Sequence, residues 1–186
     1  MRRHGTQRLE TSRLILRRFD QEDAPAMYRT WASDPQVTRF LRWEPHPDEA
    51  EPRRILTQWA AAYGDPSFYQ WAVERRSDGA LLGVIGVVRE EEGERLEPAY
   101  VLGRAYWGQG YTTEALAAVV NYLFESEGET VLSCCHAVDN PASGRVMSKC
   151  GFSYCCDAVY YKYNGTQIPC KCYELTKETY DARRND

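Results

Sequence analysis

Two glycines stand directly before a predicted helix in the stretch Trp107-Gly108-Gln109-Gly110-Tyr111-Thr112-Thr113-Glu114-Ala115. The helix is predicted from apolar residues that follow at helical spacing, namely Leu116, Val119, Val120, Leu123 and Phe124. The start of a helix offers unpaired backbone N–H groups and a partial positive charge. Glycine lets the backbone come close to a ligand that a Cβ would keep away. The spacing suits phosphate or pyrophosphate binding, with a plain tight turn as the alternative.

The two best-known phosphate-binding motifs do not fit this stretch. No Gly-Lys-Ser/Thr follows the glycines, so the loop is not a P-loop. The third glycine of the dinucleotide fingerprint is also missing. We therefore expect a phosphate site of another kind, if the loop binds phosphate.

The segments around the loop predict a mixed sheet. A strand over Pro98–Leu102 precedes the loop, and another over Thr130–Val138 follows the helix. A strand–helix–strand crossover implies that these two strands run parallel. Upstream, the apolar segments Phe68–Val73 and Leu81–Val88 read as antiparallel neighbours, separated by the turn Ser77-Asp78-Gly79.

The remaining chain supplies further helices and strands. Asp20 begins a helix that is predicted to run through Trp31, and a second helix ends at Gly64. Other expected elements are a first strand (11–19), a short helical piece after Asp34-Pro35, a loop (44–52), a charged turn (90–95), a helix from Asn140 to Gly151, and strands over 152–162 and 169–176. No repeat or linker interrupts the chain, so residues 1–186 are predicted to form one domain.

Composition excludes several classes of protein. The 186 residues carry 23 basic and 27 acidic side chains, a formal charge of −4, whereas nucleic-acid-binding domains normally have a basic footprint. No run of about 18 apolar residues is present, so we expect no membrane span. The N-terminus lacks the apolar stretch of a secretory signal, which favours a cytoplasmic location.

Seven cysteines are an unusual feature of the chain. The missing signal favours a reducing compartment and free thiols, with cysteine acting as a small buried apolar residue. Zinc binding or a structural disulfide is the alternative. Cys170 and Cys172 would lie on one face of a strand. Because His4, His46 and His136 show no metal-ligand spacing, we expect no metal.

The stretch 107–115 resembles the acyl-CoA loop of the GNAT N-acetyltransferases, and within them the branch of the ribosomal-protein N-terminal acetyltransferases. Other segments agree in order and spacing: Thr11–Arg17, Asp34–Val37, Glu97–Tyr100, and Asn140–Ser143 followed by Val146–Phe152. The resemblance covers about residues 9 to 176. The chain departs from the common pattern at Trp107, Ala99, Thr112 and Ser148. None of these four changes removes a backbone N–H donor.

The resemblance implies an α/β (α+β) fold: a mixed, mostly antiparallel central sheet with helices on both faces and two splayed parallel strands at the acyl-CoA site. It implies acetyl-CoA as cosubstrate. The residues that it assigns to acetyl-CoA binding are Val101, Leu102, Trp107, Gly108, Gln109, Gly110, Tyr111, Thr112, Thr113 and Asn140. Asn140 has a simpler alternative role, because asparagine is a common helix N-cap.

The implied reaction is acetyl transfer from acetyl-CoA to a primary amine, on a protein N-terminus or on a small molecule. An ammonium group must lose its proton before it attacks, and a carboxylate can accept that proton. Glu97 is the candidate base, with a strand-edge glutamate as the alternative. Ser143 is the candidate acid at the departing sulfur, or an ordinary polar residue of a helix's first turn. A backbone N–H near Val101 or Leu102 would stabilise the oxyanion.

Two readings of function remain open from the sequence. One is the N-acetyltransferase, acting as a monomer or homodimer; the other is a non-catalytic acyl-CoA-binding or sensor module on the same fold. The intact glycine loop, Glu97 and Ser143 favour the enzyme. A Gly-x-Ser-x-Gly elbow is absent around Ser143, so a hydrolase triad is unsupported.

Overall fold

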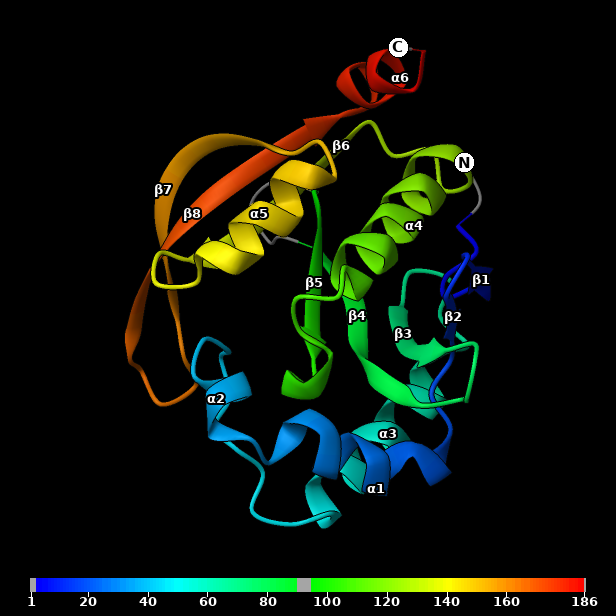
Figure 1. The fold of residues 1–186 in the computed structure, drawn as a ribbon, viewed down its shortest axis with the longest axis vertical. Coiled ribbons are helices and arrows are strands. Elements are labelled where there is room, and N and C mark those ends of the chain that lie inside the picture. Colours follow the sequence, from blue (N-terminus) through cyan, green and yellow to red (C-terminus); the bar gives the residue numbers. More distant parts are fainter. Residues whose placement is uncertain (1–2, 90–94, 186) are drawn as a thin grey trace.

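The computed structural model describes residues 3–89 and 95–185, and its centre is one eight-stranded sheet (Figure 1). The strand order is β1-β2-β3-β4-β5-β6-β8-β7. All neighbouring strands are antiparallel except β5 and β6. The strands are β1 (Leu9–Glu10), β2 (Leu14–Arg17), β3 (Tyr69–Arg75), β4 (Leu81–Arg89), β5 (Leu96–Leu102), β6 (Val131–Ala137), β7 (Ser153–Tyr161) and β8 (Gln167–Thr176). The predicted mixed, mostly antiparallel sheet is confirmed.

Six α-helices accompany the sheet within the described ranges. They are α1 (Ala24–Met27), α2 (Pro35–Thr38), α3 (Ala50–Ala62), α4 (Tyr111–Glu125), α5 (Pro141–Lys149) and α6 (Lys177–Asn185). Figure 1 shows α4 and α5 side by side near one end of the molecule, with α1 and α3 at the other end. Helix α3 begins at Ala50, inside the segment predicted as a loop, because Pro52 is tolerated in a first helical turn. The predicted charged turn lies outside the described residues, apart from Arg95.

The first helical segment is divided rather than uniform. Asp20 caps it as predicted, through a reciprocal capping box with Asp23. A 3-10 turn (Gln21–Asp23) leads into α1, and a wide π-turn over Tyr28–Ala32 follows, in which the Ser33 N–H donates to the Tyr28 carbonyl oxygen (3.2 Å). The cap chemistry at Asp20 therefore indicated a helix correctly over this stretch, but it did not indicate which hydrogen-bond pattern the backbone adopts.

Apolar side chains gather on both faces of the sheet. On one face, α4 and α5 cover a large core that includes Leu14, Trp71, Leu96, Leu116 and Leu132. On the other face, α1, α3 and the π-turn cover a smaller core. Its buried members include Phe19, Met27, Trp31, Val37, Leu56, Ala72 and Leu81. Helices on both faces were predicted, and these two cores confirm it.

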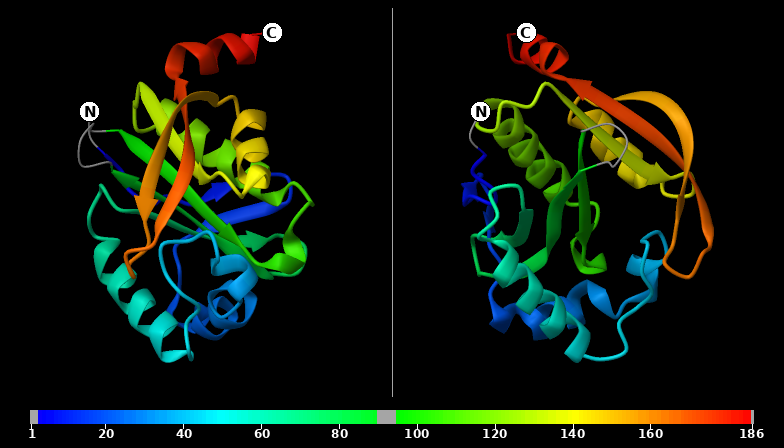
Figure 2. Two further views of the ribbon diagram at one scale, coloured as in Figure 1. Left: turned by 90° about the vertical axis from the view of Figure 1, so that its left-hand side faces the viewer. Right: turned by 180° about the vertical axis from the view of Figure 1, so that it is seen from behind.

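Strands β5 and β6 separate soon after they meet. Their parallel pairing is recorded at Leu96 and Leu132, after which β6 continues as the partner of β8. Figure 2 shows β5 and β6 diverging. Further along β5, β4 approaches so closely that a Cβ on Gly83 would lie 2.1 Å from the Val101 carbonyl oxygen, which explains the glycine. The crossover rule therefore predicted the strand direction correctly, and the two strands are splayed.

The expectation of free thiols is wrong for two of the seven cysteines. Cys135 on β6 and Cys172 on β8 form a disulfide. The two residues are direct partners in the antiparallel register, with Cα atoms 4.3 Å apart. In an antiparallel ladder, two opposed residues that exchange no backbone hydrogen bonds have their side chains closer together than a hydrogen-bonded pair does. A pairing between residues 37 positions apart depends on strand order, which spacing alone did not give.

The β7–β8 hairpin extends along one side of the molecule toward residues 39–46 (Figure 2). At its tip the Tyr163 N–H donates to the Arg42 carbonyl oxygen (2.8 Å). The Tyr160 hydroxyl donates to the Phe40 carbonyl oxygen. The hairpin is thereby connected to the segment between α2 and α3. Across residues 3–89 and 95–185, no helix has both the length and the apolar character that a membrane crossing requires.

Candidate active site

The glycine loop begins helix α4 in the manner that the sequence predicts. Gly108 and Gly110 have left-handed backbone angles, φ +73° and φ +81°, which glycine adopts without strain. Gly110 is the N-cap residue, and its carbonyl oxygen accepts from the Glu114 N–H (3.1 Å). Among the described residues, no side chain caps this helix start. The N–H groups of the first turn therefore point out of the helix without a capping side chain, as an anion site requires.

Arg13 and Glu114 hold this loop in place, and sequence reasoning missed both roles. The Arg13 side chain donates from Nε to Glu114 (2.6 Å) and from a terminal nitrogen to the Gln109 carbonyl oxygen (3.0 Å). Its guanidinium also lies 4.5 Å from the centre of the Tyr111 ring. Burial opposes ionisation of Glu114, but hydrogen bonds from Thr11 and Arg13 lower the pKa of Glu114. The turn before β2 thus fixes the first turn of α4.

Two side chains of the loop form hydrogen bonds to backbone carbonyl oxygens nearby in the chain and so stabilise the loop conformation. Trp107, which is 47% exposed, donates from Nε1 to the Leu102 carbonyl oxygen (2.7 Å). Gln109 donates from its amide to the Ala105 carbonyl oxygen (2.9 Å). Both residues were predicted as cofactor-binding, and these contacts give them a structural role in forming the loop.

The Val101 and Leu102 backbone amides point in different directions. The Gly103 N–H donates to the Leu82 carbonyl oxygen (2.9 Å), and Leu102 faces Gly83 in the register. Because ladder hydrogen bonds alternate along an antiparallel strand, the Val101 amide turns toward β4 and the Leu102 amide turns away from it. Of the two predicted oxyanion donors, Leu102 is therefore the one directed toward the separation between β5 and β6.

Ser143 contacts a tyrosine that sequence reasoning did not include. The Ser143 Oγ lies 2.8 Å from the Tyr100 hydroxyl, which also donates to the Ser143 carbonyl oxygen (3.2 Å). Burial, above all, raises the pKa of Tyr100, so its hydroxyl keeps its proton. The cap of α5 is Asn140, whose side-chain oxygen accepts from the Ser143 N–H (3.4 Å). The capping alternative is thus confirmed for Asn140. The Ser143 hydroxyl takes no part in this cap and contacts Tyr100 instead.

Glu97 lies on the opposite face of β5 from Tyr100. Leu96 and Leu102 belong to the core under α4, and successive residues of a strand alternate between faces. Glu97 therefore shares the other face with Val101, which packs against the smaller core. Burial first, and then the charge of Glu97, raise the pKa of the Cys170 thiol on β8. The carboxylate thus lies on the face of the sheet opposite Tyr100, where its charge acts on Cys170.

His136 belongs to the core rather than to a catalytic pair. It is buried, and its Nδ1 lies 2.8 Å from the Ala137 carbonyl oxygen. Its ring packs against Tyr173, and a Cβ on Gly144 would lie 2.6 Å from its Nε2. These contacts give His136 a packing role between β6, β8 and α5.

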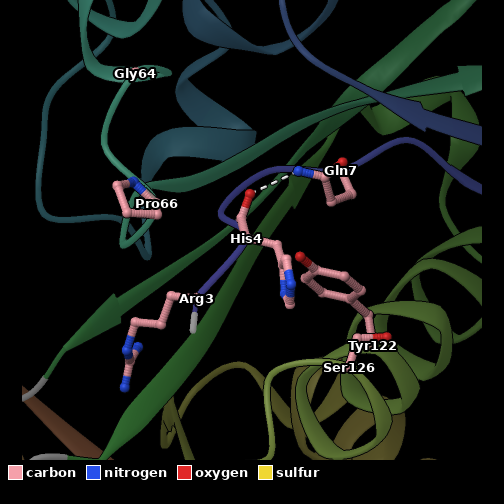
Figure 3. Close-up of a pocket in the computed structure, with 7 residues that line it drawn as sticks. All are labelled: Arg3, His4, Gln7, Gly64, Pro66, Tyr122 and Ser126. Carbon is pink, nitrogen blue, oxygen red and sulfur yellow. Dashed lines mark hydrogen bonds between the residues drawn. The ribbon is translucent and has the colours of Figure 1, made fainter. Parts of the chain in front are cut away.

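A pocket at the far end of α4 does not belong to this site (Figure 3). It is lined by Arg3, His4, Gln7, Gly64, Pro66, Tyr122 and Ser126. Glu127 beside it is buried and accepts hydrogen bonds from Tyr69 (2.8 Å), Tyr122 (2.5 Å) and the His4 N–H (3.0 Å). Through these hydrogen bonds to its carboxylate, Glu127 connects the N-terminal segment to the end of α4. Because α4 rises about 1.5 Å per residue, this pocket lies roughly 20 Å from the glycine loop.

Comparison with known proteins supports the resemblance seen in the sequence. Residues 13–153 match the family described as Acetyltransferase (GNAT) domain. YoaA of Bacillus subtilis (strain 168), an uncharacterized N-acetyltransferase, is 31% identical over 171 residues, which cover 91% of this chain and 96% of YoaA. YdaF of the same organism, named provisionally as a ribosomal N-acetyltransferase, is 23% identical over 178 residues, covering 92% and 95% of the two chains.

Solved structures agree with the fold. A GNAT-family acetyltransferase from Bacillus anthracis superposes with a TM-score of 0.81 at 21% identity, covering 92% of this chain and 99% of that one. Spermidine N-acetyltransferase from Vibrio cholerae, solved in complex with CoA and spermine, gives a TM-score of 0.75 at 17% identity, covering 91% and 99%. The chain belongs to the GNAT acetyltransferase family. It is an N-acetyltransferase whose relatives include the ribosomal branch.

Proposed function

We propose that this protein transfers the acetyl group of acetyl-CoA directly to a primary amine, with Glu97 as base and Ser143 as partner of the departing sulfur. The observation that carries the proposal is that these two residues lie on opposite sides of the sheet at β5. Glu97 is on one face of β5, and Ser143 of α5 contacts Tyr100 on the other face, beside the point where β6 separates from β5. A thioester lying in that separation would have the amine and its base on one side. The sulfur and its hydrogen-bond donor would lie on the other.

Acetyl-CoA would bind by its pyrophosphate at the start of α4. The first-turn N–H groups of Tyr111, Thr112 and Thr113 are the donors, and the left-handed Gly108 and Gly110 allow the close approach. The Leu102 N–H, turned away from β4, would donate to the thioester oxygen as negative charge develops there. In this arrangement Asn140 acts by holding Ser143 in place, since its side chain already caps α5.

The reaction needs no covalent bond to the protein. Glu97 accepts a proton from the ammonium group, directly or through water, and the free amine attacks the carbonyl carbon. The attack leaves a second proton on the nitrogen, which passes to water. The tetrahedral intermediate then collapses to the amide and expels the CoA thiolate, which Ser143 stabilises with a hydrogen bond. Because a thiol has a pKa of about 8.5, the thiolate is a good leaving group and needs only modest help. Positioning of amine against thioester contributes the rest.

The proposed acceptor is a protein N-terminus or a small-molecule amine, and the proposed location is the cytoplasm. We expect the protein to act as a monomer or homodimer, without nucleic acid or membrane.

The test is incubation with acetyl-CoA and a panel of N-terminal peptides, polyamines and amino acids. We expect one acetylated amine for each CoA released. Products are followed by mass spectrometry, because the exposed free thiols of Cys155 and Cys156 would react with thiol reagents. Tight acetyl-CoA binding without transfer to any amine would instead support the non-catalytic module.

Replacing Ser143 separates a catalytic role from a structural one. We expect Ser143→Ala to lower turnover by about 10- to 100-fold, because help is lost only where charge develops on sulfur. Acetyl-CoA affinity should change little, since the ground-state sulfur carries little charge. Isothermal titration calorimetry and turnover on one preparation provide the measurement. A lower melting temperature with normal turnover would contradict the assignment.

Tyr100→Phe provides the matched variant, because it removes the hydroxyl that contacts Ser143 and keeps the ring. If Tyr100 positions Ser143, this change lowers turnover in the wild-type background and has no further effect in Ser143→Ala. Additive losses in the double variant would show that the two hydroxyls act separately.

A further inference from the structure

Three cysteines converge on one face of the sheet. Cys135 on β6 faces Cys172 on β8, and Cys170 lies two residues before Cys172 on the same strand. Residues two apart on a strand share a face, so all three side chains project to one side. Their sulfur atoms all lie within 4.8 Å of one another. Cys170 is buried, and the other two are partly buried.

This spacing is close to that of a metal thiolate site. Zinc–sulfur bonds of about 2.3 Å at tetrahedral angles place sulfur atoms about 3.8 Å apart, which small side-chain rotations would reach here. We propose that the reduced thiols of Cys135, Cys170 and Cys172 form a binding site for a thiophilic divalent cation such as Zn²⁺. Binding releases the thiol protons to solvent, and the three thiolate sulfurs bond to the ion.

The disulfide and the metal site are alternative states of the same three residues. In the structure, Cys135 and Cys172 are bonded to each other, which leaves Cys170 as the third, free thiol. A disulfide offers no thiolate, so only the reduced chain binds the ion. Reduction of the disulfide to two thiols takes two electrons and two protons, and the proposed cytoplasmic location favours it because small-molecule thiols such as glutathione supply them there. Oxidised protein therefore serves as an internal control.

The surroundings of the three cysteines suit a cation. Glu97 lies on the same face of the sheet, and its charge acts on Cys170. A bound divalent ion would be attracted by this carboxylate as well as by the thiolates. Three protein ligands also leave a fourth coordination position open, as in zinc sites that exchange ligands. The site thus combines soft ligands with a nearby negative charge.

The test is titration of the reduced, metal-free protein with Co²⁺ under anaerobic conditions. We expect thiolate-to-cobalt charge-transfer absorption that saturates at one equivalent, with visible bands typical of tetrahedral coordination. Zn²⁺ should displace the cobalt, because zinc binds such ligands more tightly. Protein oxidised to the Cys135–Cys172 disulfide should give no such absorption. Because the readout is binding and not acetyl transfer, it stands or falls independently of the proposed function.

Single serine variants assign the ligands. Loss of a group that only supports a metal ligand costs about 10- to 100-fold in affinity. We expect a larger loss of Zn²⁺ affinity in each of the variants Cys135→Ser, Cys170→Ser and Cys172→Ser. Two of the three are only partly buried, so the test does not depend on the buried Cys170 variant folding.

The matched control is Cys150→Ser, which removes a partly buried thiol at the end of α5, where the Cys150 thiol donates to the Thr113 carbonyl oxygen of α4 (3.5 Å). It should bind Co²⁺ as wild type does. Absence of charge-transfer absorption in the reduced wild type would overturn the proposal. Retention of the absorption in the Cys135 and Cys172 variants, or its loss in the control, would do so as well.

Discussion

Gly110→Glu is expected to reduce acetyl-CoA affinity by at least about 100-fold, roughly 2.7 kcal/mol of binding free energy. Gly110 is the N-cap of α4, where the proposed pyrophosphate would accept from backbone N–H groups. A glutamate there places a negative charge and a bulky side chain against the phosphates, and it offsets the positive end of the helix. Isothermal titration calorimetry with CoA measures the loss directly.

Backbone strain has to be separated from this effect. Gly110 has φ +81°, so any other residue is strained there regardless of charge. Gly165 provides a matched control: its φ is +86°, a Cβ on it would meet nothing within 4 Å, and it lies in the β7–β8 turn. Gly165→Glu should therefore lower stability similarly and keep CoA affinity. If the folded Gly110→Glu variant kept its affinity for CoA, the assignment of the pyrophosphate to this loop would be wrong.

Local chemistry made much of the fold predictable from the sequence. Asp20 was predicted as a helix cap, and capping was the alternative to acetyl-CoA binding for Asn140, because each has a short polar side chain immediately before a helical pattern; both side chains cap their helices. The parallel pairing of β5 and β6 followed from the intervening helix. Glycine spacing likewise located the start of α4.

Contacts between distant segments were not predictable in the same way. The Tyr100–Ser143 contact spans 43 positions, and the Arg13–Glu114 ion pair spans 101. Each depends on strand order and on which helix covers which face. Helix α6 was missed because its residues are mostly polar and show no apolar stripe. The Cys135–Cys172 bond was missed because β8, the strand beside β6, comes after β7 in the chain.

Glu97→Gln is expected to lower turnover at pH 7 by about 100-fold or more, within the usual range for loss of a general base. A free α-amine has a pKa of about 8 and a lysine of about 10.4, so an acceptor is mostly protonated at pH 7. Without the carboxylate, attack depends on the small fraction of amine that solvent has deprotonated. That fraction grows as the pH rises, so the difference between variant and wild type should shrink toward the pKa of the acceptor.

Glu174→Gln is the control that distinguishes a base from a general electrostatic effect. Glu174 lies on β8, where its neighbour in the register is Ser133 of β6, and it shares its face of the sheet with Cys172. It forms an ion pair with Arg95 (2.5 Å). If negative charge on this face only attracts the ammonium group, both variants raise KM and neither acquires a new pH dependence. If Glu97 accepts the proton, only its variant loses turnover, and only its rate recovers with rising pH. A full rate for Glu97→Gln at pH 7 would assign the proton to another group or to water.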